Sequence, residues 1–117
     1  MDKAIGEAFP HKVRIVRSSD YRTLYKKGRK IHSHRFTLFI RNNDIGHSRM
    51  GLSVSRKVGG AVIRNRIKRL FREIFRKSSS EIPNQLDIVV NVKVGCVGVG
   101  YTELRTEFLD AMQKYCR

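Results

Sequence analysis

Residues 64–77 read RNRIKRLFREIFRK, and seven of these fourteen residues are Lys or Arg while only Glu73 is acidic. At about 100° per residue, the apolar side chains of this stretch fall within one narrow sector of a helix. That sector holds Ile63, Ile67, Leu70 and Ile74, with Phe71 beside it. The opposite side holds Asn65, Arg69, Arg72 and Arg76, with Lys68 close to them and with Arg64 and Arg66 at the boundary. The pattern predicts a helix with one face for a core and one densely positive face.

The positive face of this helix is unusual for a surface that meets only water. Like charges at helical spacing destabilise a helix by roughly 0.2–0.5 kcal/mol per pair, and a solvated face would normally mix both signs. The pattern therefore favours a face that binds a polyanion over an ordinary charged surface.

The whole chain of 117 residues has a net charge of +15, and this charge is unevenly spread. Residues 1–77 carry 21 basic and 5 acidic side chains, whereas residues 78–117 carry 4 basic and 5 acidic ones. Such an excess on one part of a compact domain is typical of nucleic-acid binding. A membrane surface is the rival polyanion, but the basic helix lacks an aromatic-rich insertion face and needs its apolar stripe for the core. We therefore expect a nucleic-acid partner and no membrane.

The length and composition indicate a single domain, 1–117, large enough to form a core without disulfides or metals, and its charge makes it a nucleic-acid-binding one. Residues 1–17 are poorly periodic and are expected to be extended or loose. They also lack the pattern of a secretory signal, and Cys96 and Cys116 have neither zinc nor CxxC spacing. We therefore expect a reduced, cytoplasmic setting and, without a dimer seam, a protein that is monomeric when free.

The remaining periodicities predict two more helices and three strands. Residues 20–27 and 102–115 have helical patterns, and residues 30–42 and 49–55 alternate with period two, as in an antiparallel hairpin. LDIVVNV, residues 86–92, is nearly all apolar, as expected of a strand inside a sheet. The order α-β-β-α-β-α predicts an α+β fold, an α/β sandwich around one mixed sheet. General rules would make its β-α-β crossover right-handed.

A second group of side chains indicates a site for single-stranded nucleic acid. Tyr21 and Tyr25 share one face of the first helix, and they fit either a core or a base-stacking platform. Phe39 faces Ser53 and Ser55 across the predicted hairpin, which would leave a shallow, partly aromatic trough. Both interpretations of the tyrosines stay open on the sequence alone.

The sequence offers no catalytic constellation. His32 and His34 share a strand face, but no cysteine or carboxylate is placed to complete a metal site. The carboxylates are not paired as two-metal phosphoryl chemistry requires, and Gly59-Gly60 does not fit the phosphate-binding pattern GxxxxGK[ST]. We expect no catalytic residue, no metal site and no cofactor bound by this chain.

Residues 51–76, GLSVSRKVGGAVIRNRIKRLFREIFR, closely resemble the protein subunit of bacterial ribonuclease P. That family is marked by an RNR motif, here Arg64-Asn65-Arg66, followed by KR and R-E-x-F at this spacing. The resemblance extends more loosely through DYRTLYKKG, FTLFI and LDIVV, so that it covers roughly residues 9–94.

The resemblance implies a fold and a function. The fold would be a small α/β sandwich whose crossover at the RNR helix is left-handed, against the general rule. Members of the family bind a large catalytic RNA and help it recognise precursor tRNA. The RNA, with magnesium, cleaves off the 5′ leader, and the protein is an accessory subunit of this endoribonuclease.

The resemblance also implies roles for individual residues. The positions that face the catalytic RNA and nearby substrate phosphates are Arg56, Lys57, Arg64, Asn65, Arg66, Lys68, Arg69, Arg72 and Arg76. Tyr21, Tyr25 and Phe39 match the cleft that holds the single-stranded leader, and Ser53 and Ser55 lie beside it.

Two other functions would explain the charge. A protein of another ribonucleoprotein, such as a ribosomal protein, could use the same basic helix, but the matched motif would then be unexplained. A DNA-binding regulator could place the helix in a major groove, but the sequence has no helix-turn-helix pattern and no dimer seam.

Overall fold

The structure is a computed structural model that describes residues 11–116. Its helices are α1 (Ser18–Lys27), α2 (Ala61–Lys77) and α3 (Tyr101–Cys116), and its strands are β1 (Arg29–His32), β2 (Phe36–Asn42), β3 (Arg49–Ser53) and β4 (Leu86–Val92). Short 3-10 helices lie at His11–Val13, Ser79–Glu81 and Val94–Cys96. The strands form one sheet in the order β1-β2-β4-β3, with β3 and β4 parallel and the other neighbours antiparallel. The predicted α+β fold with a mixed sheet is confirmed.

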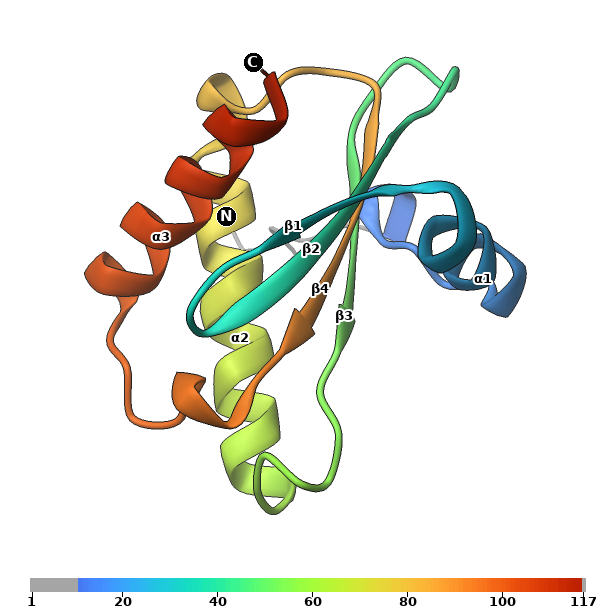
Figure 1. Cartoon of the computed structure of the whole chain (residues 1–117). Helices are drawn as coiled ribbons and strands as arrows, with labels where there is room; N and C mark the ends of the chain where they lie inside the picture. The colour runs from blue at the N-terminus through green and yellow to red at the C-terminus, as the bar shows by residue number, and fades with distance from the viewer. Residues whose placement is uncertain (1–10, 117) are drawn as a thin grey trace.

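Helices cover both faces of the sheet, as Figure 1 shows: α2 and α3 lie against one face and α1 against the other. The central strand β4 is therefore buried from both sides, which explains its nearly continuous apolar sequence. Ile88 and Val90 belong to the large core under α2 and α3, whereas Val89 belongs to a smaller cluster under α1.

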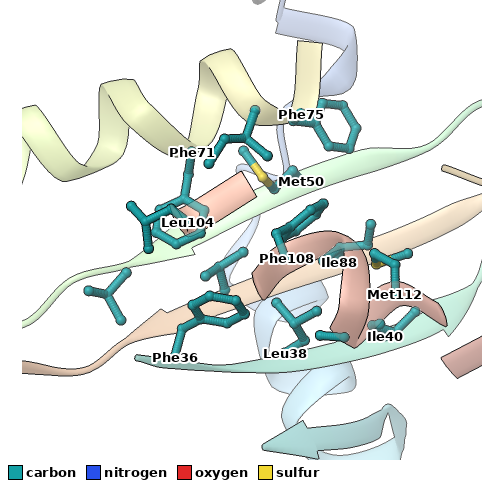
Figure 2. Close-up of a cluster of buried hydrophobic side chains, with 14 of the residues drawn as sticks. Phe36, Leu38, Ile40, Met50, Phe71, Phe75, Ile88, Leu104, Phe108 and Met112 are labelled. Atoms are coloured by element: carbon teal, nitrogen blue, oxygen red, sulfur yellow. The ribbon is translucent and has the colours of Figure 1, made fainter. Parts of the chain in front are cut away.

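The large core joins the sheet to α2 and α3 (Figure 2). Leu38 from β2, Phe71 from α2 and Phe108 from α3 are each fully buried in it. Phe36 meets Phe71 edge to face, with ring centroids 5.5 Å apart. Because burying one such side chain contributes roughly 1.5–3 kcal/mol, these contacts fix α2 as a rigid support for the residues on its other face.

The crossover from β3 through α2 to β4 is left-handed, as the family resemblance implied. The Met50 side chain on β3 faces the core under α2, while the Met50 carbonyl accepts a hydrogen bond from Ile15 N–H (3.1 Å) on the edge away from β4. When a strand runs upward and the side chain of an L residue points at the viewer, the C=O group of that residue points to the right. Viewed from α2, the Ile15 segment therefore lies to the right of β3 and β4 lies to its left. A chain that passes from β3 through α2, in front of the sheet, to a strand on the left forms a left-handed crossover. This crossover is thus an exception to the general preference for right-handed crossovers.

The predicted hairpin between residues 30–42 and 49–55 is wrong, and so is the count of three strands. Residues 30–42 contain a bend, so that β1 and β2 form the hairpin with Lys30 opposite Phe39. The apolar strand β4 lies between β2 and β3, and Val89 pairs with both Phe39 and Gly51. Placing β4 inside the sheet pairs its backbone along both edges, whereas a β2–β3 hairpin would leave it at an edge of the sheet.

Two further expectations need correction. Ile63, assigned to the apolar stripe, is 39% exposed, and the buried residues of α2 are Ile67, Phe71, Ile74 and Phe75. The stripe is thus rotated towards the phenylalanines and begins one turn later. Residues 11–17, expected to be loose, form a 3-10 turn and bury Ile15 against α1; the other residues of the expected loose segment, 1–10, lie outside the described part of the chain.

Candidate nucleic-acid interface

The sheet face that carries α1 is organised in rows that run across the strands. One row reads Lys30, Phe39, Val89 and Gly51 from β1 to β3, and the next reads His32, Thr37, Asn91 and Ser53. Side chains in both rows point to the α1 face because alternate residues of a strand share a face. The first row is partly aromatic, and the second is polar throughout.

An aromatic cluster joins α1 to the first of these rows. The Tyr25 ring meets the Phe39 ring edge to face at 4.9 Å between centroids, and Tyr21 lies 6.4 Å from Tyr25. Phe39 is 8% exposed and forms the floor, whereas Tyr25 is 40% exposed. Lys30 Nζ lies 5.5 Å from the centre of the Phe39 ring, so that a cation stands beside the aromatic cluster at the β1 edge.

A hollow of about 290 Å³ opens between α1, the outer edge of β3 and α2. Three cations line it, Arg14, Lys68 and Arg72, together with Tyr21. Burial, and then the nearby charge of Arg14, lower the pKa of the Arg72 guanidinium. Burial likewise raises the pKa of Tyr21, against a smaller opposing effect of a hydrogen bond with the Leu52 backbone. A phosphate group placed here would relieve the repulsion between the cations.

The outward face of α2 carries the predicted phosphate ligands. Asn65, Arg66 and Arg69 are exposed there, and so are Arg56 and Lys57 in the turn that leads to the helix. The helix is held from below by its buried apolar face, so the guanidinium groups of Arg66 and Arg69 project from a rigid support. Planar guanidinium groups can hold phosphate oxygens with two parallel hydrogen bonds.

Three of the predicted phosphate ligands on α2 are partly buried or contact other side chains of the protein. Arg64 is half-buried, and its Nε atom is buried without a hydrogen-bond partner among the described residues. Arg72 turns towards the hollow beside Tyr21. Arg76 is paired with Glu73, with Nη2 2.7 Å from Oε1, which makes it the least suited of the set to bind a phosphate.

The predicted cleft residues are brought together only in part. Tyr21, Tyr25 and Phe39 form the cluster described above, and Ser53 lies two residues along β3 from Gly51. Ser55 is exposed and lies beyond the end of β3, in the turn closed by the hydrogen bond from Val58 N–H to its carbonyl (3.1 Å). The predicted trough of Phe39 between two serines is therefore wrong, because β4 separates β2 from β3.

The structure adds three residues that the sequence reasoning missed, Arg14, Lys30 and Asn91. Of the three, Asn91 carries the readable signal, since it and Asp87 are the two polar residues of the apolar strand LDIVVNV. Arg14 reaches the site by pairing with Met50, 36 residues away, and Lys30 reaches it through the β1–β2 hairpin, which was not predicted.

The carboxylates of the described residues do not suit a metal-dependent nuclease site. Asp20 and Asp87 both pair with Arg49, and Glu107 pairs with Arg35. Within residues 11–116, no group of three or more His, Cys, Asp or Glu side chains could hold a metal ion. No helix in this part of the chain is long and apolar enough to cross a membrane.

We compared this chain, with its basic helix, adjoining aromatic cluster and left-handed crossover, with known proteins. The family model described as Ribonuclease P matches residues 9–116. The chain belongs to the ribonuclease P protein family. A ribonuclease P protein component from Desulfovibrio desulfuricans is 36% identical over 112 residues, which cover 92% of this chain and 86% of that protein.

Solved ribonuclease P proteins share the fold. A mutant of the Staphylococcus aureus protein superposes with a TM-score of 0.83 at 30% identity, over 99% of this chain and 98% of that one. The protein from Thermotoga maritima gives a TM-score of 0.80 at 31% identity, over 86% and 96% of the two chains. The family assignment and the fold therefore agree, and the family implies an RNA partner within an endoribonuclease complex.

Proposed function

We propose that this ribonuclease P protein binds the catalytic RNA through the exposed cations of α2 and holds the 5′ leader of precursor tRNA in the cleft beside α1. The protein thereby assists endonucleolytic removal of the leader, which gives the mature 5′ end. Family membership supports this assignment over a ribosomal or DNA-binding role, because those would leave the shared motif and fold unexplained.

One observation carries the proposal: the aromatic cluster of Tyr21, Tyr25 and Phe39 adjoins the cationic helix through the hollow beside α2. Tyr21 lines the same hollow as Lys68 and Arg72 of α2. A single strand can therefore contact aromatic rings with its bases while its phosphates meet cations. Base–aromatic stacking tolerates any sequence, which suits leaders that differ from one tRNA to the next.

We assign the chemistry to the RNA rather than to this chain. The described carboxylates are spread over the surface, and most are engaged by basic side chains. The residues present do not fit the two-metal arrangement in which ions about 3.5–4 Å apart clamp the reacting oxygens. Magnesium ions would then be held by RNA phosphates, and the protein would supply affinity, orientation and charge neutralisation. We further propose that the protein is cytoplasmic and monomeric when free.

The proposal is tested by reconstitution with a bacterial ribonuclease P RNA. Rigorously RNA-free protein should not cleave precursor tRNA specifically, and adding the RNA should give cleavage at the mature 5′ end. The complex should also bind precursor tRNA more tightly than the matching mature tRNA. Site-specific cleavage by the protein alone, or equal affinity for the two tRNAs, would contradict the proposal.

A further inference from the structure

We infer that the outer side of α1 is a second RNA-binding surface, which takes the phosphate backbone of a double-helical RNA. The proposed function gives the catalytic RNA to α2 and the leader to the cleft, and it leaves this side of the molecule without a partner. The juxtaposition that carries the inference is a pair of cationic helices on opposite faces of one sheet. A protein built in this way holds two RNA helices at once.

The segment that contains α1 is almost uniformly positive. Residues 17–30 include six basic side chains and one acidic one, and all six basic side chains are exposed. The acidic residue, Asp20, is half-buried and lies 3.6 Å from an Arg49 nitrogen. Arg22, Lys26 and Lys27 form no ion pair with any residue in the range 11–116. The charge of α1 is therefore not neutralised within the described part of the protein.

The last helix, α3, shows how a helix of this protein that meets water is charged. It carries three acidic and two basic side chains, and Arg105 pairs with Glu81. In α1, by contrast, Arg22 and Lys26 are like charges four residues apart, an arrangement that destabilises a helix. An external polyanion would turn this repulsion into attraction, which is what distinguishes a binding surface from a solvated one.

The cations of α1 point away from the sheet. Leu24 is fully buried and packs against Val89 of the central strand. Arg22 and Lys26 are each two residues from Leu24, which is about 200° of helical turn, so they lie on the opposite side of the helix. The hydrogen bond from the Tyr25 hydroxyl to Asn91 Oδ1 (2.9 Å) also ties α1 to the sheet. The two cations thus project from a fixed support.

The cations of α2 point in the opposite direction. Arg69 is two residues from both Ile67 and Phe71, which are buried in the core on the other face of the sheet. The same helical geometry places Arg69 on the outer side of α2. Because α1 and α2 cover opposite faces of the sheet (Figure 1), a stiff RNA helix that lies along one set of cations cannot reach the other. Two separate helices can be bound together.

The outer side of α1 suits a double helix rather than a single strand. The aromatic rings of α1, Tyr21 and Tyr25, lie on the side next to the cleft, where Tyr25 meets Phe39. Beside the outer cations, Ser18 and Ser19 are exposed, and their hydroxyl groups can bond to phosphate and sugar oxygens. Double-stranded RNA is recognised mainly by its shape, its phosphates and its 2′-hydroxyl groups. This recognition needs cations and hydroxyl groups but no stacking ring.

Two such surfaces on one rigid body have a consequence for assembly. Once one RNA helix is bound, contact with a second helix of the same complex is intramolecular and gains from a high effective concentration. The protein also places cations between two phosphate backbones that repel each other. A further helix of the catalytic RNA and a helix of tRNA both offer the required backbone.

The test measures whether one protein molecule joins two RNA duplexes. Blunt RNA duplexes of about 16 base pairs, the length that a double-stranded RNA-binding domain spans, carry either a donor or an acceptor fluorophore. Wild-type protein at half the total duplex concentration should give energy transfer between duplexes. A large excess of protein should abolish it, because each duplex then has its own protein. Sedimentation at the first ratio should show two duplexes with one protein.

Variants of α1 connect the bridging to named residues. Arg22→Ala with Lys26→Ala should bind one duplex through α2 and should lose the energy transfer. Arg22→Lys with Lys26→Arg keeps both charges and should keep the bridging. Unchanged thermal melting shows that both variants are folded.

Two further double variants test the geometry. Arg66→Ala with Arg69→Ala should also bind one duplex without bridging, because only the α1 surface remains. Arg105→Ala with Lys114→Ala removes the same amount of charge from α3 and should bridge duplexes as the wild type does.

The reconstituted complex then distinguishes the two sources of the RNA helix. If the helix belongs to the catalytic RNA, Arg22→Ala with Lys26→Ala should weaken binding of that RNA, and the slope of log affinity against log salt should become shallower by about one for each phosphate lost. If the helix belongs to tRNA, the affinities for precursor and mature tRNA should fall by the same factor while binding of the catalytic RNA is unchanged. Either result supports the inference.

Several results would overturn it. Wild-type protein that binds one duplex only, or an α1 alanine variant that bridges as the wild type does, would show that α1 is not an RNA-binding surface. Loss of bridging in the α3 variant as well would make the total charge responsible instead of α1. A complex in which the α1 alanine variant changes neither affinity would also contradict the inference. Failure of the proposed function has a different result, namely equal binding of precursor and mature tRNA with bridging intact.

Discussion

Tyr21 lies so close to Gly51 that the two positions constrain each other. A Cβ atom added to Gly51 would come within 2.6 Å of the Tyr21 hydroxyl oxygen and 2.8 Å of the carbon that bears it. Real Cβ atoms essentially never come this close to another heavy atom, so the absence of a side chain at Gly51 is what leaves room for the Tyr21 ring over β3. The conformation of the hollow beside α2 depends on this contact, since Tyr21 lines it.

Gly51→Ala should therefore displace Tyr21 and weaken binding of precursor tRNA. The expected loss is that of one stacked base, roughly 1–3 kcal/mol, while binding of mature tRNA should change little because it has no leader. Binding of both tRNAs to the reconstituted complex measures the effect. Gly100→Ala is a matched control, because an added Cβ there has nothing within 4 Å and should leave both affinities unchanged. Equal losses for the two tRNAs would mean that Gly51 supports the fold rather than the leader site.

Phe39 should contribute mainly to folding stability, and Tyr25 should contribute mainly to binding of precursor tRNA. Phe39 is 8% exposed, and cutting a buried aromatic side chain to Ala typically costs about 3–5 kcal/mol of folding free energy. Tyr25 is 40% exposed, so Tyr25→Ala should cost clearly less stability and act mainly on precursor tRNA. Denaturant unfolding and tRNA binding of the two variants give the comparison. If the Tyr25 variant is destabilised as much as the Phe39 variant, both rings belong to the core and Tyr25 is not a stacking platform.

The structure could be predicted best from the sequence where the residues that determine a feature lie in the same short stretch as the feature itself. In α2 the spacing of Ile67, Phe71 and Ile74 fixes the buried face, and this leaves Arg66 and Arg69 outward whatever the rest of the chain does. The two tyrosines of α1 are likewise four residues apart and share a face. The predicted stripe included Ile63 wrongly and missed Phe75, because the buried face begins one turn later and is rotated towards the phenylalanines.

The order of the strands in the sheet could not be predicted in the same way, because the residues that determine it lie far apart in the sequence. The bend between β1 and β2 contains no Gly or Pro. It is held instead by Glu107 of α3, which accepts hydrogen bonds from the Ser33 hydroxyl and from Arg35 N–H (2.9 Å for the latter). Since that partner lies more than 70 residues away, the local pattern reads as one long strand. The misplacement of Ser55 follows from the same error in strand pairing.

Asp87→Asn should loosen the attachment of α1 to the sheet. Arg49 donates to both oxygens of Asp87, at 2.9 and 2.7 Å, and its remaining nitrogen lies 3.6 Å from Asp20 in the first turn of α1. The hydrogen bonds that Arg49 donates to Asp87, ahead of other effects, raise the pKa of Arg49, because they favour its charged form. Hydrogen bonds to charged groups contribute about 1.5–3 kcal/mol.

The predicted loss of unfolding free energy for Asp87→Asn lies in that range and is measured by urea unfolding. Asp44→Asn serves as the control, because Asp44 is exposed in the neighbouring turn and has no ion pair among the described residues. A loss no greater than that of the control would show that the pair is not what fixes α1.

Arg66 and Arg69 should contribute to RNA binding without contributing to folding. Both are exposed on the face of α2 opposite its buried residues, so changing both to Ala should alter the free energy of unfolding by no more than about 0.5 kcal/mol per site. Binding of the catalytic RNA should weaken at every salt concentration. The slope of log affinity against log salt should also become shallower by about one for each phosphate that the variant no longer neutralises. Arg105→Ala is the matched control, since Arg105 lies on α3 and is paired with Glu81, and its salt slope should equal that of the wild type. A double variant whose slope is also unchanged would show that the cations of α2 do not contact phosphates, whatever happens to the affinity itself.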